Sequence, residues 1–129
     1  MRRLFIMRKD LNMSAGKLAS QVGHCAEAYW TNLIRDKQDP PQNVIDEYLN
    51  GLFIKTVCEA RNKNHLLKAK EKALELGLIE GKDFGVIQDA CFTELAPEED
   101  DGTTITGIWF KPLSDEVAKS ISKKYQLYK

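Results

Sequence analysis

The 129-residue sequence has no apolar run that approaches the roughly 20 residues needed to span a bilayer. Its basic start, "MRRLFIMRKD", holds only four apolar residues in a row, whereas a secretory signal needs about 7 to 15. The sequence also has no internal repeat, low-complexity tract or interdomain linker. These absences argue against a membrane protein and predict one cytoplasmic domain over residues 1–129.

Cysteine is scarce and forms no pattern typical of disulfides or zinc sites. Cys25, Cys58 and Cys91 are odd in number, and no two of them have CxxC spacing. No other cluster of metal ligands is visible, and we predict no metal or other cofactor. Buried, reduced thiols are the simplest interpretation, because free cysteine packs as a small hydrophobe.

The chain has no excess charge of either sign, since 19 Lys and Arg balance 19 Asp and Glu. Net charge therefore gives no support to nucleic-acid binding. The distribution is uneven: residues 1–37 contain seven basic and three acidic side chains, whereas "ELAPEEDD" has five acids in eight positions. This pattern is compatible with a local basic face and equally with an ordinary solvated surface.

The sequence does contain an alternation of strand and helix patterns. Apolar runs predict strands at 3–8, 52–60, 84–90 and 103–110. Helical patterns run from a Ser14 cap to about Asp36, over 44–49, over 62–78 with Gly77 as the stop, and from Asp115 to Tyr125. This order predicts an α/β fold with a mixed, roughly four-stranded sheet and helices on both faces. We expect the first three strands to be parallel and the last antiparallel.

The first predicted helix carries a polar row beside its apolar stripe. At about 100° per residue, the polar row of Lys17, Gln21 and His24, with Ala28, falls within about 60°. The apolar stripe is set off by about 100° and consists of Leu18, Val22, Cys25, Tyr29 and Leu33. The polar row therefore lies at the margin of the buried face, where it can face a site or brace the core.

Two loops bring reactive groups to one predicted edge of the sheet. Ligands of open α/β sheets bind beyond the carboxyl ends of the parallel strands. Lys17 follows the first strand, Asp89 ends the third, and Thr93 lies in the next loop. We expect them to converge, although a solvated lysine and a capping aspartate are ordinary alternatives. Lys17 opposes the helix dipole, which favours a role for it. His24 lies about 10 Å further along the helix, too far to share one reacting atom with Lys17.

The segments "MRKDLNMSAGKLASQVGHCAEAYW" and "VIQDACFTELAP" resemble the two signature regions of the second, archaeal–eukaryotic class of peptidyl-tRNA hydrolases. The matching residues of the first region are Arg8, Asp10, Leu11, Met13, Gly16, Lys17, Gln21 and His24. Those of the second are Gln88, Asp89, Ala90, Thr93, Ala96 and Pro97. The resemblance spans nearly the whole chain, and residues 32–51 are longer and less like the family.

The sequence departs from the family pattern beside Asp89 and Thr93. Cys91 replaces a glycine, Phe92 an arginine and Glu94 a glutamine. A glycine at such a turn often has a positive φ, which cysteine adopts poorly. The other two changes remove positive potential where an RNA end is expected.

The resemblance implies cleavage of the ester between a peptide and the 3′ ribose of tRNA, in tRNA recycling. Asp89 is expected to orient or deprotonate water, and Lys17 to stabilise the oxyanion or neutralise a phosphate. Thr93 is expected to hydrogen-bond the ester or the water, with His24 as a supporting group or proton carrier. The expected substrate-binding residues are Gln21, Arg8, Met13 and Gln88. Phosphate contacts are expected from Arg2, Arg3, Arg8 and Lys9, if these cluster near the site.

The resemblance also implies a homodimer, to which Trp30, Trp109 and Phe110 could contribute, although core packing is the ordinary role of such side chains. Two other functions remain open from the sequence. One is a non-catalytic tRNA- or protein-binding relative on the same fold, in which Phe92 stacks on a base or a partner. The other is a hydrolase of a different small ester or amide.

Overall fold

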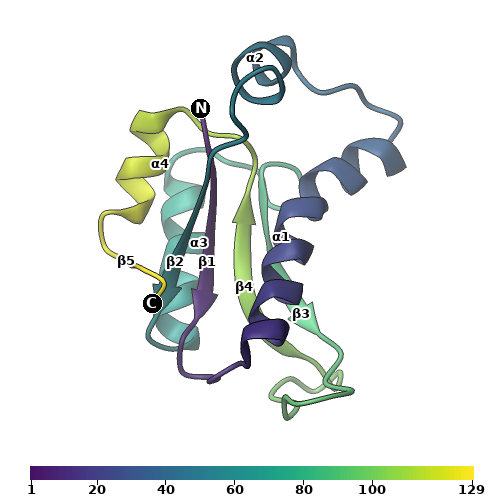
Figure 1. Ribbon diagram of the computed structural model, residues 1–129, viewed down its shortest axis with the longest axis vertical. Coiled ribbons are helices and arrows are strands. Elements are labelled where there is room, and N and C mark those ends of the chain that lie inside the picture. Colours follow the sequence, from purple (N-terminus) through teal and green to yellow (C-terminus); the bar gives the residue numbers. More distant parts are fainter.

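The computed structural model describes residues 1–129 and contains strands and helices in alternation (Figure 1). The strands are β1 (Arg3–Arg8), β2 (Lys55–Ala60), β3 (Phe84–Asp89), β4 (Thr104–Phe110) and β5 (Gln126–Leu127). The helices are α1 (Ala15–Arg35), α2 (Gln42–Val44), the π-helical turn η1 (Ile45–Leu49), α3 (Lys63–Glu75) and α4 (Asp115–Ser122). None of the helices is both long and apolar enough to cross a membrane.

The five strands form one mixed sheet in the order β3-β4-β1-β2-β5. β1 and β2 pair in parallel, whereas β4 pairs antiparallel with both β1 and β3, and β5 antiparallel with β2. The prediction of a parallel set of three strands was wrong in its pairing: β3 points the same way as β1 and β2, but β4 lies between. Nearly all residues of β4 are buried, which suits an internal strand whose two edges and two faces are all covered.

β5 is the strand that the sequence did not predict. It is two residues long and exposed, and its backbone pairs Gln126 with Glu59 and Leu127 with Cys58. A strand this short has no periodic pattern to detect. The last helix is correspondingly shorter than expected, because the chain leaves α4 after Ser122 and turns into β5.

Helices cover both faces of the sheet, as predicted (Figure 1). α1 packs on one face, over a cluster formed by Phe5, Met7, Cys25, Tyr29, Ile87 and Trp109. α3 and α4 pack on the other face, over a larger cluster that includes Leu4, Ile6, Leu66, Ile108, Phe110 and Ile121. Alternate residues of β1 therefore enter different cores, as the pleat of a strand requires.

The start of α1 is fixed by its predicted cap. The hydroxyl of Ser14 accepts a hydrogen bond from the N–H of Lys17 at 3.2 Å, which satisfies one of the free amides of the first turn. Because the cap sets where the helix begins, it also sets the direction in which Lys17 and Gln21 leave the helix. Gly77, at φ +80°, ends the segment after α3 as expected.

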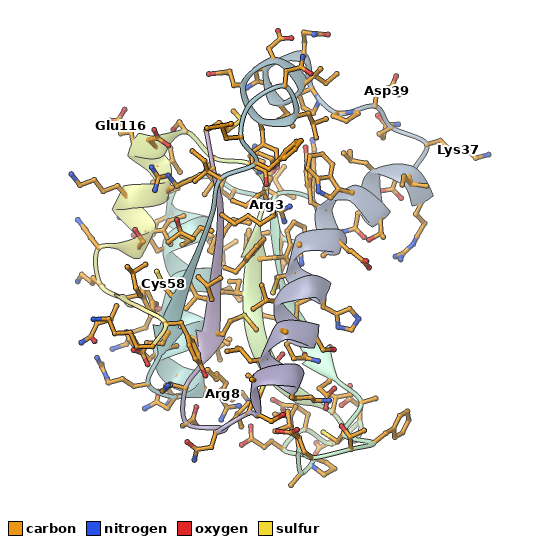
Figure 2. All side chains as sticks on the ribbon, in the orientation of Figure 1. Arg3, Arg8, Lys37, Asp39, Cys58 and Glu116 are labelled. Carbon is orange, nitrogen blue, oxygen red and sulfur yellow. The ribbon has the colours of Figure 1, made fainter.

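Arg3 anchors α1 to the sheet from inside the core. Its side chain is fully buried and donates to the carbonyls of Phe110 (2.7 Å), Cys25 (3.0 Å) and Ala26 (3.1 Å). Burial lowers the pKa of Arg3 to about 10. The expectation that Arg3 contacts phosphate is therefore wrong, since its donors are used inside the protein. Figure 2 shows Arg3 and Arg8 toward opposite ends of β1.

Candidate active site

Lys17 and Asp89 form an ion pair at the carboxyl edge of β1 and β3. The Lys17 ammonium lies 2.7 Å from Oδ1 of Asp89, and each side chain is only about a tenth exposed (12% and 11%). α1 supplies the cation and β3 the carboxylate, from positions 72 residues apart in the sequence. The two far-apart segments thus share one site.

Thr93 completes this cluster from the loop after β3. Its hydroxyl lies 3.2 Å from the Lys17 ammonium, and the side chain is exposed. A cation, an anion and a hydroxyl therefore meet where the chain is open to solvent. Such a group can bind a carbonyl or phosphate oxygen and hold a water molecule next to it.

The Asp89 carboxylate is held by further donors. The backbone N–H of Cys91 donates to Oδ2 at 2.9 Å, and Nε2 of Gln21 to Oδ1 at 3.4 Å. Burial acts to raise the pKa of Asp89, but the Lys17 and Cys91 hydrogen bonds and the charges of Lys17 and His24 outweigh it and hold this pKa below its usual value. The carboxyl group is therefore ionised at neutral pH and fixed in orientation.

Gln21 is buried and links this cluster to the centre of the sheet. Its Oε1 accepts a hydrogen bond from the Thr106 hydroxyl at 2.7 Å, while its Nε2 faces Asp89. Both ends of the amide are thus used, and the side chain has one orientation. Thr106 was not predicted as a site residue, although two threonines that alternate in a largely apolar strand, Thr104 and Thr106, are a signal of buried hydrogen bonds.

Cys91 stands where the family pattern has glycine, and its backbone has a positive φ of 62°. This conformation is strained for a residue with a Cβ atom, as expected from the replacement of a glycine by cysteine. The backbone N–H of the same residue donates to the Asp89 carboxylate. The strained turn therefore supplies one of the donors that orient the carboxylate.

The other two departures have different surroundings. Phe92 is 91% exposed and contacts no other ring. Glu94 accepts hydrogen bonds from the backbone N–H of Ser14 (2.8 Å) and from its hydroxyl (2.7 Å), and these bonds lower the pKa of Glu94. Glu94 thereby joins the loop after β3 to the start of α1.

Arg8 lies at the same edge but is paired within the protein. Its guanidinium contacts Asp10 (2.8 Å) and Glu98 (2.5 Å) and donates to the Ile105 carbonyl at 3.0 Å. Burial acts to lower the pKa of Arg8, but the two carboxylates outweigh this and raise it. Glu99 makes a further ion pair with Lys63 of α3. The acidic 94–101 loop is thus held at three points.

The remaining predicted residues are more scattered. Met13 is buried in the β1–α1 loop, and Gln88 is exposed and donates to the Thr103 hydroxyl at 2.9 Å. His24 is exposed one turn beyond Gln21 and makes no hydrogen bond. The basic residues do not cluster: Arg2 pairs with Asp115 at 3.0 Å, and Lys9 donates to the Lys129 carbonyl at 2.6 Å.

No group of three or more His, Cys, Asp or Glu side chains is arranged to hold a metal ion. The chemistry that the described groups can supply is electrostatic: an ammonium and a hydroxyl for an oxygen that gains charge, and a carboxylate for a water proton.

A comparison with protein families gives a match over residues 1–128 to the family described as "Peptidyl-tRNA hydrolase PTH2". The chain belongs to this family. The match covers β1, α1 and the loop after β3, so that the elements which bring Lys17, Asp89 and Thr93 together all lie within it.

Similar proteins named "Peptidyl-tRNA hydrolase" occur in archaea. The protein of Pyrobaculum aerophilum is 32% identical over 123 residues, which are 95% of this chain and 93% of that protein. The protein of Thermoplasma volcanium is 31% identical over 121 residues, or 94% and 92% of the two chains. That of Sulfolobus acidocaldarius is 28% identical over 128 residues, or 98% and 99%. The likeness therefore extends over nearly the full length of each chain.

Proposed function

We propose that this chain hydrolyses the ester between the peptide and the tRNA in peptidyl-tRNA, and that Lys17, Asp89 and Thr93 carry the reaction. Membership of the peptidyl-tRNA hydrolase family supports a hydrolase over a non-catalytic binding relative. The observation that carries the assignment to residues is the ion pair of Lys17 and Asp89, 2.7 Å long, beside the Thr93 hydroxyl.

In the proposed mechanism Asp89 acts mainly by orientation. Its pKa is held below the usual value, so the carboxylate is a poor proton acceptor at neutral pH but a strong acceptor of hydrogen bonds. It aligns a water molecule for attack on the ester carbonyl. The Lys17 ammonium stabilises the negative charge that develops on the carbonyl oxygen, and Thr93 donates to the ester or the water.

One proton must move from the attacking water to the leaving ribose oxygen. Attack by water releases one proton, and the 3′ ribose oxygen requires one when its bond to the carbonyl carbon breaks. His24 is proposed to relay this proton through an intervening water, because an imidazole ring can accept and donate, and His24 lies too far along α1 to touch the atom that Lys17 contacts. Its exposed position one turn from Gln21 leaves it open to that water.

Substrate contacts are proposed for Gln21, Met13, Gln88 and Arg8. Gln21 fixes the orientation of Asp89, and Gln88 precedes it on the open side of β3. A tRNA phosphate reaches Arg8 by replacing Glu98, since both present paired anionic oxygens to the guanidinium. Binding is expected to weaken as salt concentration rises.

We further propose a cytoplasmic homodimer in which residues 1–129 act as one hydrolase domain. Trp109 and Phe110 are buried in the core of the chain, and Trp30 stacks on Tyr48. The segment Leu52, Phe53 and Ile54, with 87%, 51% and 46% exposure, is the better contact surface. Sedimentation measurements at several protein concentrations test the dimer.

The test of function is release of tRNA from N-acetyl-aminoacyl-tRNA. We expect Lys17→Ala and Asp89→Asn each to lower kcat/KM by about 10²–10³-fold, the usual loss for an electrostatic catalytic group. The matched control is the exposed pair Lys72 and Glu75 on α3, altered to Lys72→Ala and Glu75→Gln. Full activity in both site variants contradicts the residue assignment, and tRNA binding without turnover by the wild type contradicts the function.

A further inference from the structure

A groove of about 560 Å³ runs between α1 and β3 and begins beside the candidate active site. Its lining includes His24 and Gln88 at the end near Asp89, and Asn32 and Gly81 at the other end. The Asn32 amide donates to the Gly81 carbonyl at 3.1 Å and so joins the two walls near that end, where Arg35 and Glu80 also line the groove. At its other end the groove leads toward the Lys17–Asp89 pair. Figure 1 shows α1 running alongside β3.

The length of the groove fits a short extended peptide. His24 and Asn32 are eight positions apart, which is a rise of about 12 Å along α1. An extended chain covers that distance in three or four residues, at about 3.3 Å each. No other part of the chain occupies this space.

β3 is an edge strand, and part of its backbone is free to pair. The Asp83 carbonyl accepts from Lys111 on the side of the sheet, whereas the Phe84 carbonyl accepts from Gly81 on the outer side. Backbone groups alternate along a strand, so the N–H and C=O of Val86 also face outward. The bridge to residue 80 is isolated and does not continue past Phe84. Val86 therefore presents one donor and one acceptor to the groove.

The floor of the groove holds a second unpaired donor. Trp109 is 3% exposed and lines the groove, and its indole N–H has no hydrogen-bond partner. Gly85 leaves this group uncovered: a Cβ atom there would lie 2.8 Å from Nε1 of Trp109. Because an indole nitrogen only donates, this N–H can pair with an acceptor in the groove such as a peptide carbonyl.

We infer that this groove binds the peptide moiety of peptidyl-tRNA as an added strand along β3, recognised through its main chain. This inference rests on the proposed function. The ester lies at Asp89, so the peptide runs toward Asp89 in the same direction as β3 and parallel to it. Main-chain pairing gives affinity without regard to side chains. A hydrolase with this groove accepts many peptide sequences and favours peptides over single amino acids.

Two substrates that share a C-terminal residue test the inference: N-acetyl-alanyl-tRNA and N-acetyl-tetraalanyl-tRNA. For the wild type we expect kcat/KM to be at least tenfold higher with the tetrapeptide. A third substrate has its three inner peptide amides N-methylated, which removes their donors. It is expected to lose that tenfold advantage, and this arm requires no protein variant.

Thr31→Trp fills the groove from α1. Thr31 is exposed, and its hydroxyl bonds only to carbonyls of its own helix, Glu27 and Ala28. The ratio of kcat/KM for tetrapeptide over single residue is expected to fall toward one. Ile34→Trp is the matched control, because Ile34 is 75% exposed on the same helix but does not line the groove. This control is expected to keep the wild-type ratio.

The outcomes separate the two proposals. If the wild type cleaves both unmodified substrates at equal kcat/KM, or cleaves the N-methylated substrate as well as the tetrapeptide, the groove inference is overturned and the hydrolase function stands. If the wild type cleaves none of the three substrates, the proposed function itself fails. A Thr31→Trp protein that keeps the full ratio also overturns the inference.

Discussion

Arg3 and Lys17 are two cations in the first part of the chain that the structure places in opposite circumstances. Arg3 is fully buried, its donors end on backbone carbonyls, and burial lowers its pKa to about 10. Lys17 stands at an open edge, where it meets a carboxylate and a hydroxyl. The two residues differ in their partners: backbone carbonyls hold a cation that supports packing, whereas a carboxylate and a hydroxyl surround one that can take part in chemistry.

The largest effect on stability is expected from replacing Arg3. Arg3→Met keeps an unbranched, mostly apolar stem but leaves three carbonyls without their donor. Each bond to a charged donor contributes about 1.5–3 kcal/mol, and the variant no longer has to bury a charge, so we expect the free energy of unfolding to fall by roughly 3–5 kcal/mol. Urea denaturation gives this value. The specific activity of the folded fraction is expected to stay near that of the wild type, and a selective loss of activity would instead return Arg3 to the site.

A smaller change in stability is expected at the open edge, where Cys91 has a strained backbone. Cys91→Gly is expected to raise the free energy of unfolding by about 1 kcal/mol or less, because glycine adopts φ +62° without a Cβ clash but loses more chain entropy. Thermal unfolding of the two proteins measures this. Cys91→Ala serves as the control, since it removes the thiol but keeps the Cβ atom. Equal gains in both variants would show that the thiol, and not the backbone, is responsible.

The smallest effect is a shift in the titration of Asp89. In the wild type its pKa lies below the ordinary 3.8, so the stabilising Lys17 contact is present above that pH and is lost as the pH falls through the lowered pKa. In Lys17→Ala the burial remains while the main opposing partner is gone, so we expect this pKa to rise. NMR titration of the Asp89 carboxyl carbon from pH 2 to 7 detects the change. An unaltered titration would mean that Cys91 and His24 suffice to hold the carboxylate.

Much of this architecture follows from local patterns. The Ser14 cap, the amphipathic stripe of α1 and the Gly77 stop are short-range features, and the structure has each of them. The placement of β4 between β1 and β3 is different, because strand order depends on which edges are buried and not on any one segment. β5 has two residues and is too short to show a periodic pattern.

The candidate site likewise combines contacts that could be predicted from the sequence with contacts that could not. Lys17 and Asp89 could be brought together from the sequence because Lys17 follows a strand and Asp89 ends one, and both strands end at one edge of the sheet. The link from Gln21 to Thr106, and that from Glu94 to Ser14, join distant segments through single hydrogen bonds. No spacing rule finds such contacts. The pairing of Arg8 with Glu98 likewise depends on how a long loop folds back.

That folded-back loop has a consequence for how a polyanion meets this protein. Glu94, Glu98 and Glu99 are each engaged by a neighbouring group of the same chain, namely Ser14, Arg8 and Lys63. Two of the five acids in this stretch, Glu98 and Glu99, are thus neutralised by cations of the same chain. An approaching nucleic acid is therefore repelled less by this stretch than its five acids in eight positions would imply.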